Sequence, residues 1–256
     1  MTMASSRTIK AFNDYSPWMA IPKGMLQTDL DTNWVPKNRF FEEQDLSSIQ
    51  NIFKCINIEN DLIPSHEEYQ LKISTLQSND IDHFNSRIME AETQLMRILP
   101  HFELLISRLV RKYIPIDNSN SVQSDTGMST LWFKGAIFFE HNQRASLDQR
   151  TENLAHEIAH QILINYQLND TLIASDLNQE IYSGIRETNR PAILAFHAAA
   201  ALSNMLWIQS TLGNRQRANQ LSAQLKSTLT DLEKVKTTII GRKIMDEFHQ
   251  ALHSFH

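Results

Sequence analysis

Apolar residues recur at intervals of three or four through most of the chain, which is the spacing of helices with one buried face. This pattern predicts helices over residues 46–57, 80–98, 101–113, 214–238 and 242–254, and a further helix that begins at Ser146. Only residues 130–140 combine aromatic and β-branched residues densely enough to indicate a strand. Glycine is scarce, at six of 256 residues, whereas a sheet-rich fold needs it in many tight turns. The chain is therefore expected to be mainly α with a small β-sheet, in the α+β class.

The composition argues against several classes of function. The net charge is −5, which disfavours broad binding of nucleic acid or of an anionic membrane. No apolar run approaches the length of a membrane span, and the polar N-terminus lacks a signal-peptide core. Cys55 is the single cysteine, so no disulfide can form within the chain. These features predict a cytoplasmic protein with neither nucleic acid nor membrane as a partner.

One stretch carries recognisable chemistry: His156-Glu157-x-x-His160, the HExxH pattern. Residues four apart lie on the same face of a helix, so His156 and His160 can present two imidazoles to one metal ion. Glu157 is placed to reach a metal-bound water or to orient a ligand. The stretch from Ser146 to Gln149 predicts a capping box that starts this helix.

A metal site on this helix needs a third protein ligand from elsewhere in the chain. The extended signature HExxHxxGxxH is absent, because glycine does not follow His160 at the required position, and this excludes the metzincin class. Glu180, Glu187 and His197 compete for the third position, and Asp176 is a weaker option. Glu180 would suit a glutamate-type zinc peptidase, whereas His197 lies on a further helix, which is predicted to begin near Pro191.

The blocks HEIAHQ and YSGIRETNRPAILAFHAAAAL resemble the HExxH-motif family of peptide β-hydroxylases, iron- and 2-oxoglutarate-dependent enzymes associated with ribosomally synthesised, modified peptides. That family follows the HExxH helix with a Tyr-x-x-x-Arg-x-x-x-Arg-Pro stretch and a helix with Gln or His six residues after the proline. The matching positions are His156, Glu157, His160, Tyr182, Arg186, Arg190, Pro191 and His197. The resemblance covers residues 130–210. It departs from the commoner pattern at Ile185, where tryptophan is usual, and in the pair between Glu157 and His160.

The resemblance implies an Fe(II)- and 2-oxoglutarate-dependent oxygenase that hydroxylates a side-chain β-carbon of a peptide, which could carry a leader segment. His197 would be the third metal ligand beside His156 and His160. Glu180 stays open as the alternative, because two histidines and one carboxylate are the better-attested iron arrangement. Glu157 would then orient a ligand or a water.

The arginines and the tyrosine of the resembling block suit the co-substrate. Arg186 or Arg190 can hold the distal carboxylate of 2-oxoglutarate with a bidentate fork, and Tyr182 can add a hydrogen bond. A structural role competes with this interpretation for each arginine. For Arg190 it is a helix-start residue paired with Glu187 or Asp176.

Two other classes of function remain open. A zinc metallopeptidase would use Glu157 as general base and Glu180 as third ligand, with the predicted strand 130–140 holding an extended peptide. A non-catalytic helical module that kept the fold would bind no metal.

The chain is expected to form one domain over residues 1–256. Its parts are an irregular N-terminal arm (1–45), a helical segment (46–115), a metal and co-substrate core (128–212) and C-terminal helices (214–256).

Overall fold

The computed structural model describes residues 38–42, 45, 72–73, 78–117, 127–129, 135–141, 145–176, 179–184 and 187–254. The helix predicted over 46–57 lies outside these residues. The described chain is mainly helical with two small sheets, as the sequence predicted for the α+β class.

The larger sheet has four strands in the order β1-β2-β4-β3. They are β1 (Lys72–Ile73), β2 (Lys112–Asp117), β4 (Ala136–Glu140) and β3 (Gly127–Met128). The central pair, β2 and β4, is parallel, and the two outer strands pair antiparallel with it. Only the second half of the predicted strand 130–140 is described, and it lies inside the sheet.

The helix predicted over 101–113 is wrong after Leu109, so the segment 46–115 is not wholly helical. Helix α4 (Phe102–Leu109) ends where Val110 turns to extended backbone, and β2 begins two residues later. Tyr113, Ile114 and Ile116 are all buried, on both faces of the strand. Continuous burial is typical of parallel strands, and it gives an apolar run that periodicity alone cannot separate from a helix.

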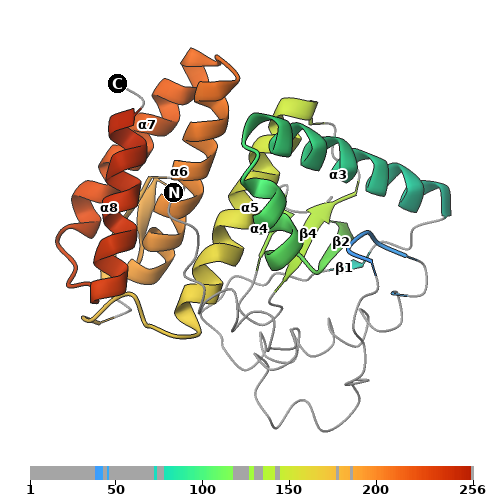
Figure 1. Ribbon diagram of the computed structural model, residues 1–256. Helices are drawn as coiled ribbons and strands as arrows, with labels where there is room; N and C mark the ends of the chain where they lie inside the picture. The colour runs from blue at the N-terminus through green and yellow to red at the C-terminus, as the bar shows by residue number, and fades with distance from the viewer. Residues whose placement is uncertain are drawn as a thin grey trace, which may run out of the picture.

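Helix α5 (Leu147–Gln167) lies between two hydrophobic cores (Figure 1). On one side are the large sheet, α4 and α3 (Ser78–Ile98), which meet α5 through Leu154 and Ile158. On the other side are the C-terminal helices, which meet α5 through Ala159 and Leu163. Apolar residues on both sides of α5 explain why a helix bearing a polar motif is nonetheless buried.

The C-terminal half is a group of three helices with a small hairpin. Strands β5 (Glu180–Ser183) and β6 (Thr188–Pro191) pair antiparallel, and α6 (Ala192–Thr211) follows at once. Helices α7 (Arg215–Leu232) and α8 (Ile239–Ser254) complete the group, and two helices were predicted there. Helix α7 ends six residues before the predicted end at 238, and α8 begins three residues before the predicted start at 242. The hairpin was not predicted, and it packs against α6 and α7.

Among the described helices, α6 is the one long and apolar enough to cross a membrane by length and composition. Within the protein, however, 78% of its apolar stretch is buried. Its alanine run, Ala198 to Ala201, is buried, and α5 and α7 both pack against this helix. These are the properties of a core helix.

Residues 38–42 and Asp45 are tied to the sheet by one buried ion pair and two hydrogen bonds. Lys112, almost fully buried, donates to the carbonyls of Asn38 and Phe40 and pairs with Asp45 at 2.5 Å. Phe41 is 1% exposed in the core beneath the sheet. The end of the predicted N-terminal arm therefore forms part of the body of the protein.

Candidate functional site

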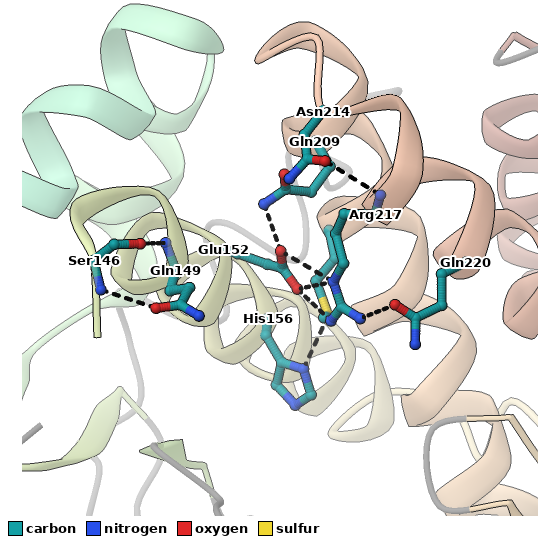
Figure 2. A network of polar contacts seen from close by, with 9 residues as sticks. Ser146, Gln149, Glu152, His156, Gln209, Asn214, Arg217 and Gln220 are labelled. Atoms are coloured by element: carbon teal, nitrogen blue, oxygen red, sulfur yellow. Dashed lines mark hydrogen bonds and ion pairs between the residues drawn. The ribbon is translucent and has the colours of Figure 1, made fainter. Parts of the chain in front are cut away.

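The HExxH motif lies at the centre of α5. This helix begins at the predicted capping box: the Gln149 amide donates to Ser146 Oγ at 3.3 Å, and the Ser146 amide donates to Gln149 Oε1 at 2.9 Å (Figure 2). Two and a half turns later, the Nε2 atoms of His156 and His160 lie 3.0 Å apart. Both rings are only partly buried. The two nitrogens are therefore close enough to share one bound ion.

Met205 of α6 determines which nitrogen of His156 is protonated. The Nδ1 atom of His156 lies 3.3 Å from Met205 Sδ, the contact drawn beside the sulfur in Figure 2. A thioether can accept a hydrogen bond but has none to donate, so the proton belongs on Nδ1. The Nε2 atom of a neutral His156 then carries a lone pair, which faces His160.

His197 of α6 extends the row of histidines to three. Its Nδ1 lies 3.2 Å from Nδ1 of His160, and its Nε2 lies 2.9 Å from Oε1 of Gln167. Burial, and to a lesser extent the charge of His156, lowers the pKa of His197 to about 4. His197 is therefore neutral at pH 7, where each ring nitrogen has a distinct donor or acceptor role.

Within the described part of the chain, no group of three or more His, Cys, Asp or Glu side chains is arranged to hold a metal ion. The reason is visible in the contacts of His160, which faces His156 through Nε2 and His197 through Nδ1. The three rings form a row and do not surround one point. That His197 is the third ligand stays a prediction, and it requires His197 to reach the Nε2 side.

Glu157 points away from α6, toward the sheet. Its side chain is 4% exposed, and its Oε1 lies 3.9 Å from Nε2 of His156. A Cβ on Gly127 of β3 would lie 3.0 Å from the same oxygen, and Ser129 Oγ donates to the Glu157 carbonyl at 3.4 Å. In the described sheet β3 is an outer strand, so the motif lies beside one edge of the sheet.

One turn before His156, a buried carboxylate joins α5 to α6 and α7 (Figure 2). Glu152 accepts from Gln209 Nε2 at 2.5 Å and from Arg217 Nη2 at 2.6 Å, with a second Arg217 contact through Nε at 3.1 Å. Gln220 in turn accepts from Arg217 at 2.9 Å. This network holds the two neighbouring helices beside the first histidine of the motif.

The hairpin separates the two described residues expected to bind the co-substrate. Arg190 is directly opposite Ile181, so both side chains lie on one face, whereas Tyr182 projects from the other. Ile181 is buried in the core that also contains Ala159, the neighbour of His160. Arg190 thus lies on the face of the hairpin that is packed against this core, and Tyr182 lies on the opposite face. Arg186, the other predicted clamp, lies outside the described residues.

The remaining candidates for the third ligand are on the surface. Glu180, on β5, and Asp176 are both exposed. Glu187 is exposed in the hairpin turn with a φ of 53°. None of these carboxylates belongs to a metal-binding group among the described side chains.

Three residues beside the motif were missed from the sequence: Gln167, Met205 and Glu152. For two of them a signal exists, because Glu152 lies four residues before His156 and Gln167 seven residues after His160. Both spacings return to the same face of a helix. Met205 gives no such signal, since its position depends on how α6 packs.

Comparison of the sequence with the models of known protein families finds no match, and comparison with curated proteins likewise finds none.

Proposed function

We propose that the protein is an Fe(II)- and 2-oxoglutarate-dependent oxygenase that hydroxylates a side-chain β-carbon of a peptide. The observation that carries the proposal is the pair of Nε2 atoms, 3.0 Å apart, on His156 and His160. Met205 favours a lone pair on the nitrogen of His156. A lone pair at this distance from another ring nitrogen is stabilised only by a shared proton or a bound cation, and imidazole nitrogen is a good ligand for divalent iron.

In this proposal His156 and His160 hold the metal through Nε2, and His197 is the predicted third ligand. When bound, Fe(II) and 2-oxoglutarate supply the activation of dioxygen. Glu157, which is buried beside His156, would orient a ligand or a water and would not act as a base.

Arg190 supports the assignment of 2-oxoglutarate over a hydrolytic reaction. It is half-buried, and no ion pair between described residues includes it, so neither Glu187 nor Asp176 neutralises it as a structural role would require. A half-buried guanidinium on the core face of the hairpin suits a dicarboxylate co-substrate. Arg186 remains the second candidate.

A peptide substrate is supported by the position of β3. This outer strand contacts α5, and Gly127 brings its backbone against Glu157. An extended peptide that pairs with a sheet edge is bound through backbone hydrogen bonds, with little demand on its sequence. Such a peptide would pass beside the two histidines.

The test is anaerobic reconstitution. Metal-free protein receives Fe(II) and then 2-oxoglutarate, and the visible spectrum is recorded for wild type, Arg190→Ala, Arg186→Ala and Arg215→Ala. Arg215 is exposed at the start of α7 and is the matched control. The proposal is supported by a new absorption band that forms only when Fe(II) and 2-oxoglutarate are both present. Either Arg190→Ala or Arg186→Ala should need more 2-oxoglutarate to form this band, and Arg215→Ala should not. The absence of any band, with stoichiometric tight binding of zinc, contradicts it.

A zinc metallopeptidase is the second candidate, and the position of Glu157 favours it. A buried carboxylate 3.9 Å from a ligand nitrogen could take a proton from an attacking water. Against it, the expected third ligand Glu180 is exposed on β5. Peptide cleavage that continues without oxygen, and that Glu157→Gln abolishes, would establish this alternative.

A further inference from the structure

Gln167, in the last turn of α5, lies at the outer end of the histidine row. Its Oε1 is 2.9 Å from His197 Nε2. Gln167 follows His160 by seven residues, which is two helical turns, so both side chains lie on the α6 side of α5. His197 fits between them, with its Nδ1 3.2 Å from His160 Nδ1. The contacts form a continuous chain from Gln167 to the Nε2 atom of His160.

A carbonyl oxygen can only accept, and this gives the chain of hydrogen bonds a direction. His197 must donate from Nε2 to Gln167, and a neutral imidazole with its proton on Nε2 has a lone pair on Nδ1. That lone pair then accepts from His160, which must carry its proton on Nδ1. The Nε2 atom of His160 is left with a lone pair, facing His156 at 3.0 Å.

We propose that Gln167 is a positioning residue for the metal site: by accepting from His197, it holds His160 in the tautomer whose Nε2 can bind a metal ion. The inference rests on the proposed function for the identity of the ligand atoms. It describes the metal-free state, in which both ring nitrogens of His197 are used, one by Gln167 and one by His160. If His197 binds the metal as well, it must first leave one of these two partners.

The opposite direction is the physical alternative. If the amide nitrogen of Gln167 faced His197 instead, the chain would reverse, and His160 would carry its proton on Nε2, where it could not bind a metal. Met205 meanwhile keeps the His156 proton on Nδ1. The orientation of the Gln167 amide thus determines which ring nitrogen of His160 carries the proton.

The first experiment reads tautomers in the metal-free protein. Long-range ¹H–¹⁵N correlation spectra distinguish Nδ1-protonated from Nε2-protonated histidine, and single histidine substitutions assign the signals. In wild type we expect His160 protonated on Nδ1 and His197 on Nε2. In Gln167→Leu, which has no acceptor, the His160 signal should move toward a mixture of tautomers. In wild type, His160 protonated on Nε2 and not on Nδ1 would overturn the proposal.

The second experiment measures binding of Co(II) to metal-free protein by competition with a chelator. Loss of a hydrogen-bonded partner of a metal ligand weakens metal binding by about 10–100-fold, and we expect this for Gln167→Leu. Gln167→Glu, which keeps an acceptor, should restore at least wild-type affinity. Leu168→Ala, an exposed neighbour at the helix end, is the control and should leave affinity unchanged. Equal affinities in Gln167→Leu and Leu168→Ala would overturn the proposal.

The two experiments separate this proposal from the function on which it rests. If the Fe(II) and 2-oxoglutarate band forms but Gln167→Leu changes neither tautomer nor affinity, only the role of Gln167 is wrong. If the tautomers are as expected and Co(II) binds, but no band forms, the positioning role stands and the oxygenase assignment is wrong.

Discussion

Acid should destabilise the metal-free protein through His197. Burial, with a smaller effect from the charge of His156, lowers the pKa of this side chain to about 4 from an ordinary value of 6.5. Because the unfolded chain takes up a proton near pH 6.5 and the folded chain only near pH 4, the unfolded state holds more protons between these values. The contribution of His197 to stability is therefore complete above pH 6.5 and is lost as the pH falls toward 4.

The magnitude follows from the width of that window. One pH unit of difference corresponds to about 1.4 kcal/mol, so a difference of 2 to 3 units corresponds to about 3 kcal/mol of unfolding free energy. This is a large fraction of the stability of an ordinary domain, which is about 5–15 kcal/mol. Protonation of His197 alone should therefore cause a measurable loss of unfolding free energy.

The assay is urea denaturation in EDTA at several values between pH 7 and pH 4.5, for wild type, His197→Gln and His83→Gln. His83 is exposed on α3 and serves as the matched control. Between pH 7 and pH 4.5, the unfolding free energy of wild type and of His83→Gln should fall by the same amount. The fall should be smaller in His197→Gln, and the difference should be most of the 3 kcal/mol. A direct NMR titration of His197 should give a midpoint near pH 4. Parallel curves for all three proteins, or a midpoint near 6.5, would refute the reasoning.

Three further outcomes are expected. Arg217→Met should lower the unfolding free energy by about 2–4 kcal/mol, because Glu152 stays buried without its cation. Adding Glu152→Leu should recover part of this loss in urea denaturation. If it recovers none, the loss does not come from the unpaired carboxylate. Gly127→Ala should lower the unfolding free energy by about 1–3 kcal/mol, since its Cβ would lie 2.8 Å from Phe139 and 3.0 Å from Glu157. An unchanged midpoint in urea would mean that β3 can shift to make room for the Cβ without loss of stability. Co(II) at one hundred times its dissociation constant should stabilise the protein by about 2.7 kcal/mol, reversibly with EDTA, and no shift would show that the protein binds no Co(II).

The local parts of the site were open to prediction from the sequence. A capping box involves only Ser146 and Gln149, three residues apart, and the approach of His156 to His160 follows from helical spacing. Helices α3, α7 and α8 were predicted for the same reason, since each has a regular apolar stripe. In all these cases the interacting residues are within a few positions of each other.

The elements that were missed are those that depend on a distant partner. Strand β2 carries an apolar run like that of a helix, and only its parallel pairing with β4 makes it a strand. The hairpin of β5 and β6 contains no glycine in its two strands, and its faces became distinguishable only once Ile181 was packed in the core. That packing puts Arg190 on the core face of the hairpin and Tyr182 on the other.

The sequence by itself determined that this protein is mainly helical and that one helix presents two histidines on a common face. Only the tertiary structure decided which neighbours those histidines have, because Met205 and His197 reach them from α6. The spacing of two residues on a helix determines the relative direction of their side chains over one or two turns. The partner of each remaining ring nitrogen depends on how two helices pack, and that is set by many weak apolar contacts distributed along the whole chain.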